Sequence, residues 1–280
     1  MKHLNEAKKA KFDEYYTQYI DVQNEMTLYI DKFKNKTIYM NCDDPSFSNF
    51  WKYFYNNFRE LQLKQIISTY YNPCGKSYKT TYDGVKETKT PLQGNGDFRS
   101  DECIEILKEA DLIITNPPFS IWSQFFNILI DNKKQFLILG TILKAGQSNT
   151  LIELKHSRIW LGANEVNEFV VPDDYDKHHV TRDGKKYKKV ACYWYTNIKK
   201  QKRKQLFKDR TTEYYDKYRR VVNIDRIEDI TLEHKYLGVP VTIFQYEYED
   251  YFEVLGKIKA TVNNTNKFQR IVLKRKNFIN

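Results

Sequence analysis

Four consecutive residues, Asn116-Pro117-Pro118-Phe119, combine groups that suit chemistry on an exocyclic amino group. The lone pair of an adenine amino nitrogen is delocalised into the ring, so this nitrogen is a poor nucleophile. The Asn116 side-chain oxygen and the Pro117 carbonyl would accept its two N–H groups and favour a tetrahedral nitrogen. Consecutive prolines lack N–H groups and have a fixed φ, which keeps that carbonyl available. The motif predicts methyl transfer to an amino group, with Phe119 stacking on a flipped base.

A second motif, Gly96-Asp97-Phe98, precedes Asn116 by one short predicted helix and one predicted strand. The Asp97 carboxylate is suited to accept the amino group of a cofactor's adenine, and Phe98 is suited to pack on that ring. Methyl transfer from an activated sulfonium depends on positioning more than on acid–base catalysis. We therefore expect S-adenosylmethionine as the cofactor.

The elements that would position these motifs alternate between buried strands and amphipathic helices, which is typical of an α/β core. Asn116 directly follows the strand predicted at 111–115, at the edge where open α/β sheets bind their ligands. Asp44-Pro45, Ser100 and Ser120 are predicted to begin helices, as N-caps or as a proline in the first turn. Further strands are predicted at 37–42, 65–71 and 135–140, with a hairpin at 78–88 around Asp83-Gly84.

Aromatic residues dominate the helix predicted after Asp44-Pro45. They recur at helical spacing, so we expect them to share one face and to pack in the core rather than to bind a ligand. They are Phe47, Phe50, Trp51, Phe54 and Phe58.

The C-terminal part of the chain differs from the preceding part in its pattern of predicted elements and in its basic residues. Segments 165–171 and 190–196 are predicted to form a late antiparallel pair with a lysine-rich loop between them. A strand is predicted at 239–244, a short helix at 250–255 and a basic ribbon at the C-terminus. We place a domain boundary near Ile198.

Positive charge is concentrated in one segment. The chain of 280 residues carries a formal net charge of +10, yet residues 177–220 alone contain 16 Lys and Arg against 4 Asp and Glu. Phosphate contacts release condensed counterions, so a polyanion is the natural partner of such a segment. Arg182, Arg203, Arg219 and Arg220 are candidates for reading bases. A solvated charged face is the plain alternative.

Composition narrows the class of protein. The four cysteines, at positions 42, 74, 103 and 192, form no CxxC pair, and no metal site is expected. No run of about 18 apolar residues occurs, so we expect no transmembrane helix and no membrane partner. The polar N-terminus does not resemble a secretory signal. These features predict a soluble cytoplasmic protein.

With these residues in place, the chain resembles the EcoRI-type adenine-specific DNA methyltransferase family, from about Phe12 to about Arg275. The similarity is carried by an ordered set of short stretches. They are DEYYT at 13–17, NCDDPSFSNF at 41–50, GDF at 96–98, NPPFSIW at 116–122, IWLGAN at 159–164, WYTN at 194–197 and GVPVTIF at 238–244.

The resemblance implies a Rossmann-like class I methyltransferase sheet of seven strands with the last pair antiparallel. It implies a methyltransferase domain over residues 1–198 and a target recognition, DNA-binding region over residues 199–280. Double-stranded DNA would be the substrate and the enzyme a monomer. It would act in a restriction-modification system, with a cognate restriction endonuclease as its functional but not physical partner, or in a phage or host DNA modification system.

The resemblance also assigns site residues. Tyr16 and Thr17 would contact the methionine part of the cofactor, with Asn41 and Asp43 near the same group. Asp97 and Phe98 would hold the cofactor's adenine, and Asn116 to Phe119 the target base.

Two features depart from the wider methyltransferase pattern. The first strand is followed by Cys42-Asp43-Asp44-Pro45, without the glycines that usually let the backbone approach the cofactor. The second strand ends in Ser68-Thr69-Tyr70-Tyr71, without an acidic residue for the ribose hydroxyls. No ribose ligand is therefore assigned, and segment 141–149 has no assigned role.

Three alternatives remain open from the residues. An RNA adenine or guanine N-methyltransferase would use the same chemistry, although the long region after Ile198 favours duplex DNA. A metal-dependent nuclease would use Glu233-His234-Lys235, a pattern that this charged chain repeats elsewhere. A binding module with this fold but no activity is the third.

Overall fold

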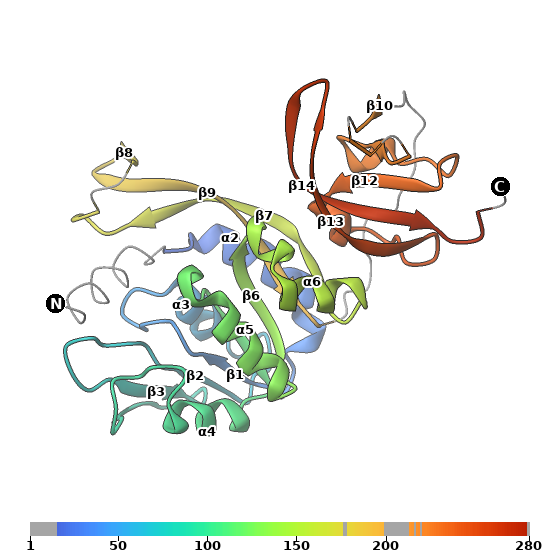
Figure 1. The fold of residues 1–280 in the computed structure, drawn as a ribbon. Helices are drawn as coiled ribbons and strands as arrows, with labels where there is room; N and C mark the ends of the chain where they lie inside the picture. Colours follow the sequence, from blue (N-terminus) through green and yellow to red (C-terminus); the bar gives the residue numbers. More distant parts are fainter. Residues whose placement is uncertain (1–15, 176–177, 199–212, 216, 219, 279–280) are drawn as a thin grey trace. The chain divides into compact units, whose positions relative to one another are not determined.

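A computed structural model describes residues 16–175, 178–198, 213–215, 217–218 and 220–278 (Figure 1). The chain forms two compact units. The first comprises Met1–Thr141 and Asn164–Lys199, and the second comprises Ile142–Ala163 and Lys200–Asn280. The predicted boundary near Ile198 places segment 142–163 in the N-terminal region, whereas in the structure this segment belongs to the second unit. No helix in the described part of the chain is long and apolar enough to cross a membrane.

The first unit is built around a large mixed sheet. Its strand order is β4-β3-β2-β1-β5-β6-β9-β7, and β8 pairs with β9. Strands β2, β1, β5 and β6 are parallel to one another, whereas β9 is antiparallel to β6. The strands are β1 (Thr37–Met40), β2 (Gln65–Ser68), β3 (Tyr78–Tyr82), β4 (Glu87–Pro91), β5 (Leu112–Thr115), β6 (Gln135–Thr141), β7 (Trp160–Val171), β8 (Val180–Arg182) and β9 (Lys185–Thr196).

The predicted α/β class and the central strands are confirmed. The sheet has nine strands among the described residues rather than the seven expected. Strands β2, β1, β5, β6, β9 and β7 are joined by the hairpin strands β3 and β4 at one edge and by the short β8, which pairs with β9. The four residues of β1 and of β5 are all buried, as in parallel sheets that are covered on both faces. Because β1 and β5 are parallel neighbours, the residues that follow them lie together at the carboxyl end of the sheet.

Helices cover both faces of this sheet. Phe50 and Phe54 of one helix pack in the same core cluster as Ile38 and Met40 of β1, whereas Tyr39 faces Cys103 of another helix on the opposite side. The helices of this unit are α2 (Tyr19–Met26), η1 (Thr27–Lys32), α3 (Asn49–Asn56), α4 (Asp101–Glu109), η2 (Phe119–Ile121) and α5 (Trp122–Asp131).

Helix α5 lies close to β6 because Gly140 has no side chain. A Cβ at Gly140 would lie 2.5 Å from the ring of Trp122, which is fully buried. The ring of Trp122 also stacks on Phe126 at 5.8 Å and meets Tyr195 of β9 edge-on at 4.9 Å. This packing holds α5, and with it the segment after β5, against the sheet.

Helix starts were predicted correctly at one of three positions. Ser100 caps α4 and accepts a hydrogen bond from the backbone N–H of Cys103. The predictions at Asp44-Pro45 and at Ser120 were wrong. Helix α3 begins at Asn49, where the Ser48 side chain accepts from two backbone N–H groups, and α5 begins after the short helix η2. In both cases a tight turn separates the strand from its helix.

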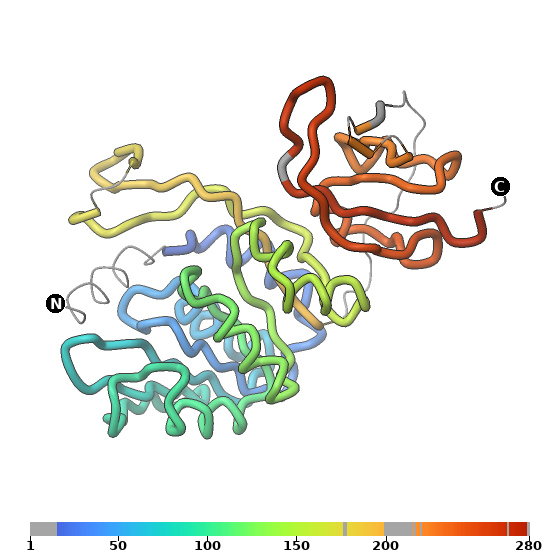
Figure 2. Tube along the Cα trace, in the orientation of Figure 1, coloured from blue at the N-terminus to red at the C-terminus, as the bar shows by residue number. Residues whose placement is uncertain are grey.

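The second unit contains a five-stranded sheet with the order β10-β11-β12-β14-β13. Strands β13 and β14 run side by side as a long hairpin (Figure 2). Asn263 and Asn264 form its turn with positive φ angles of 48° and 61°, which favour a two-residue hairpin. The elements are η3 (Ile142–Gly146), α6 (Ser148–Lys155), β10 (Glu213–Tyr214), β11 (Val222–Asn223), η4 (Ile227–Asp229), β12 (Tyr236–Pro240), η5 (Val241–Gln245), β13 (Phe252–Val262) and β14 (Thr265–Arg275).

Two local predictions in the second unit were wrong. Segment 250–255 is not a helix, because Phe252 and Val254 are buried while Glu253 and Leu255 are exposed, a period of two that belongs to β13. The strand predicted at 239–244 ends instead at Pro240, and a 3₁₀ helix follows.

Candidate active site

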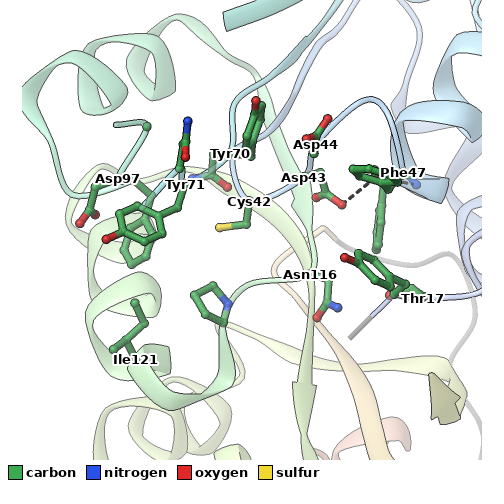
Figure 3. Close-up of a pocket in the computed structure, with 18 of the residues that line it drawn as sticks. Thr17, Cys42, Asp43, Asp44, Phe47, Tyr70, Tyr71, Asp97, Asn116 and Ile121 are labelled. Atoms are coloured by element: carbon green, nitrogen blue, oxygen red, sulfur yellow. Dashed lines mark hydrogen bonds between the residues drawn. The ribbon is translucent and has the colours of Figure 1, made fainter. Parts of the chain in front are cut away.

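A cavity of about 640 Å³ opens at the carboxyl ends of the parallel strands β1, β2 and β5 (Figure 3). This size is in the usual range for a small-molecule site. Each strand contributes the residues that follow it, which is where open α/β sheets bind ligands. The lining includes Tyr16, Thr17, Asn41, Cys42, Asp43, Asp44, Phe47, Tyr70, Tyr71, Asp97, Phe98, Arg99, Asn116, Pro118 and Ile121.

Residues from both predicted motifs line this cavity. Figure 3 shows Asp97, Tyr71 and Ile121 on one side, and Asn116, Thr17 and Phe47 on the other. The two predicted motifs therefore belong to a single site, although the chain separates them by a helix and a strand.

The segment 116–119 leaves the end of β5, and two of its four residues reach this site. Asn116 and Pro118 line the cavity and are half-buried. Pro117 is buried and is not among the lining residues. Phe119 is only 7% exposed and meets Phe169 edge-on, with ring centroids 6.3 Å apart. Its ring belongs to the hydrophobic core cluster rather than to the cavity wall.

Asp43 connects the loop after β1 to the end of β5. Its buried carboxyl group accepts hydrogen bonds from the hydroxyls of Thr115 and Ser48, the latter at 2.7 Å, and from the backbone N–H of Asn116. Burial raises the pKa of Asp43 to about 6, against the lowering effect of these donors. Ser68 of β2 donates to the Asp43 carbonyl. Asp43 therefore links the carboxyl ends of β1, β2 and β5.

Thr17 Oγ1 and Asn41 Oδ1 are buried oxygens of the cavity wall that have no hydrogen-bond partner within the described part of the chain. Thr17 itself is held in place, because its carbonyl accepts from Asn49 Nδ2 at 2.8 Å, and Tyr16 forms a backbone bridge with Val170. Buried polar atoms are nearly always paired, so these oxygens fit a polar ligand.

Asp97 lines the cavity, but its carboxylate is already bound by a neighbour. The Arg99 guanidinium donates to both carboxylate oxygens, from Nε at 2.9 Å and from Nη2 at 2.6 Å, and its Nη1 donates to Gln124 at 2.8 Å. Burial opposes ionisation of Asp97, but Arg99 outweighs it and lowers the pKa of this carboxyl group. Phe98, the next residue, is buried and packs edge-on against Phe125.

Glycine at position 96 is required by the path of the backbone. Its φ is +77°, and a Cβ there would lie 2.0 Å from the carbonyl oxygen of Tyr70. The GDF loop thus touches the loop after β2, which brings Tyr70 and Tyr71 to the cavity beside Asp97.

Sequence reasoning did not single out several lining residues. The sequence pattern places Tyr70 and Tyr71 in the second strand, predicts that Phe47 packs in the core, and assigns no role to Arg99. The rule that ligands bind beyond the carboxyl ends of parallel strands could have identified the tyrosines. Nothing in the local pattern distinguishes Phe47 from the buried aromatics that follow it.

A basic hairpin extends from the same edge of the sheet. Thr141, the last residue of β6, pairs with Cys192, so residues 185–191 of β9 project beyond the carboxyl end of β6. Lys185 and Lys189 are exposed there. Arg182 on β8 pairs with Glu168 and lies 4.4 Å over the Tyr187 ring. Of the other arginines proposed to read bases, Arg220 is exposed, and Arg203 and Arg219 lie outside the described residues.

The chain is similar to one family model and to several named methyltransferases. The family model described as adenine-specific methyltransferase EcoRI matches residues 3–278. The Type II methyltransferase M.MgeORF184P of Mycoplasma genitalium is 36% identical, over 97% of this chain and 92% of that protein. M.MpnI of Mycoplasma pneumoniae is 34% identical, over 91% and 85%. M.EcoRI of Escherichia coli is 32% identical, over 98% and 97%. No solved structure matches the chain.

Proposed function

The chain belongs to the adenine-specific methyltransferase EcoRI family, and from this premise we propose that it transfers a methyl group from S-adenosylmethionine to N6 of an adenine in double-stranded DNA. One observation carries the proposal. Asn116 and Pro118, from the end of β5, line the same cavity as Asp97, Asn41 and Thr17. An amino-group site and a cofactor site are thus adjacent.

The acceptor side of the reaction rests on Asn116 and Pro117. The Asn116 side-chain oxygen accepts a hydrogen bond from one N–H group of the target amine, whose lone pair then points toward the cavity. The Pro117 carbonyl is the proposed acceptor for the other N–H group, although Pro117 is buried and is not among the lining residues. The Asn116 backbone is held by the Asp43 carboxyl group, so this acceptor is positioned before the base arrives. Such preorganisation contributes most where charge develops in the transition state.

The donor side rests on residues at both ends of the cavity. Thr17 Oγ1 and Asn41 Oδ1 are buried acceptors suited to the amino group of a methionine part. The Asp97 carboxylate accepts a hydrogen bond from the amino group of an adenine ring that packs near Phe98. Arg99, which donates to the same carboxylate, must share or release it. When bound, the sulfonium of S-adenosylmethionine supplies a methyl group that needs no further activation.

Duplex DNA as the substrate is supported by charge at the edge of the cavity. Lys185 and Lys189 are exposed on the part of β9 that projects past β6. Cationic side chains at this edge bind phosphates, and an adenine flipped from the duplex enters the cavity beside Asn116. We assign residues 1–198 to methyl transfer and 199–280 to target recognition. We further propose a cytoplasmic monomer that protects DNA from a cognate restriction endonuclease.

The proposal is tested by methylation of genomic DNA with labelled S-adenosylmethionine, followed by base-resolved mapping of the product. We expect N6-methyladenine at one short recurrent sequence, and little label in RNA that contains the same sequence. Preferential labelling of RNA would move the substrate to that class. Cleavage of DNA that needs magnesium but no S-adenosylmethionine would indicate a nuclease instead.

A further inference from the structure

We propose that Phe47 supplies the aromatic surface against which the target base stacks beside Asn116. This inference rests on the proposed function and assigns a base-contacting residue within it. Phe47 is 68% exposed, although it begins the run of aromatics predicted to face the core. Its ring lines the cavity on the same side as Asn116 and Thr17 (Figure 3).

Phe119, the aromatic residue of segment 116–119, already packs in the hydrophobic core. Phe119 is 7% exposed, meets Phe169 at an interplanar angle of 79° and lies in the core cluster. Turning this ring into the cavity would remove it from that cluster, at the cost of a buried aromatic contact. Phe47 needs no such rearrangement, because most of its surface is already open to solvent.

The backbone beneath Phe47 is fixed in a tight turn. The N–H groups of Phe47 and Ser48 both donate to the Asp44 carbonyl, at 3.0 and 2.8 Å. Ser48 caps α3 and also donates to the Asp43 carboxyl group, which in turn accepts from the N–H of Asn116. One carboxyl group therefore holds both the turn that carries Phe47 and the acceptor that would bind the amine.

The surroundings of Phe47 suit a planar ligand. Tyr16 also lines the cavity, with its ring centroid 6.4 Å from that of Phe47. Phe47 also lines a second depression of about 340 Å³, together with Trp51 and Lys52 of α3. A singly exposed apolar residue on a protein surface is common. An exposed ring that lines the cavity on the side of the proposed base acceptor is suited to stacking, since every nucleobase has a π-face.

The test uses the full-length protein and a duplex that contains the mapped site, with the target adenine or with 2-aminopurine in its place. The variants are Phe47→Ala, Phe47→Leu and Phe47→Tyr. The matched control is Tyr78→Ala, which removes an exposed aromatic of β3 outside the cavity lining. Because the Phe47 ring is mostly exposed, the three Phe47 variants should unfold at the wild-type temperature.

We expect Phe47→Leu to lower the single-turnover methylation rate at saturating cofactor by about tenfold to a hundredfold, as loss of base stacking predicts. The bound 2-aminopurine should be brighter than in the wild type, because an aromatic neighbour quenches it. Phe47→Tyr should restore both values, and the control should match the wild type. Phe47→Leu tests the aromatic character separately from size, and it decides the question if Phe47→Ala is unstable.

Two outcomes would overturn this inference. One is an unchanged rate and 2-aminopurine signal in Phe47→Leu. The other is weaker cofactor binding by calorimetry with a wild-type rate at saturation, which would mean that the ring covers the cofactor. Both leave the proposed function intact, since they presuppose an active wild-type enzyme. A wild-type protein that does not methylate duplex DNA would instead remove the proposed function itself.

Discussion

The hydroxyl of Thr115 donates a hydrogen bond to the carboxyl group of Asp43, 72 residues earlier in the chain. Thr115 ends β5 and is fully buried, and Asp43 follows β1. Because β1 and β5 are parallel neighbours, their carboxyl ends meet, and this contact joins the loop that lacks glycine to the segment that begins with Asn116. A buried carboxyl group with such partners should affect both stability and catalysis.

Asp43→Asn is expected to change how stability depends on pH. The pKa of Asp43 is raised from 3.8 to about 6 in the folded protein, mainly by burial. A raised pKa stabilises the folded state below about pH 4, and this contribution is lost as pH rises through 6. The loss amounts to about 3 kcal/mol for a shift of about two units.

Urea unfolding of both proteins from pH 4 to 8 measures this effect. The wild type should lose stability relative to Asp43→Asn as pH rises, because the amide cannot ionise. The hydroxyls of Ser48 and Thr115 can reorient to suit an amide, so the variant should fold. Parallel pH curves for the two proteins would show that the buried carboxyl does not titrate in this range.

Asn116→Ala should reduce methyl transfer by more than about a hundredfold, as loss of a preorganised hydrogen-bond partner does in other enzymes. Cofactor binding, measured by calorimetry, should remain within about twofold of the wild type, because Asn116 is assigned to the amine. Asn24→Ala, an exposed asparagine on α2, is the matched control. Turnover like that of the wild type in Asn116→Ala would refute the assigned mechanism.

Asp97→Ala should weaken S-adenosylmethionine binding about tenfold, the effect of losing one hydrogen bond to a charged group. The rate at saturating cofactor should change much less, since Asp97 lies at the far end of the cavity from Asn116 (Figure 3). Asp131→Ala on α5 serves as the exposed control. An unchanged dissociation constant by calorimetry would mean that Asp97 serves only to orient Arg99, to which it is bound.

The salt dependence of DNA binding should report the basic hairpin. Replacing Lys185 and Lys189 together with alanine should reduce the slope of log K against log salt by about two, since each phosphate contact contributes about 0.9. The control replaces Lys64 and Lys108, which precede β2 and β5 and therefore lie at the opposite edge of the sheet. Equal slopes for the two double variants would take the hairpin out of the DNA interface.

Local sequence patterns were sufficient for much of the first unit. Buried strands, the Ser100 cap and the hairpin at Asp83-Gly84 follow from periodicity and turn chemistry, which depend on neighbouring residues. The position of Asn116 at the end of β5 follows in the same way. The second unit was predicted less well, because a short apolar stretch such as 250–255 fits a helix or a strand until its pairing with β14 is known.

Sequence alone thus predicted a chemistry for the site, since the residue types and spacing of segments 96–98 and 116–119 are local properties. The tertiary structure decided how that chemistry is arranged. It buried Phe119 and left Phe47 exposed, paired Asp97 with Arg99, and brought Asp43 to Thr115. The exposure of a ring and the partner of a carboxyl group depend on segments distant in the chain, and helical spacing carries no information about them.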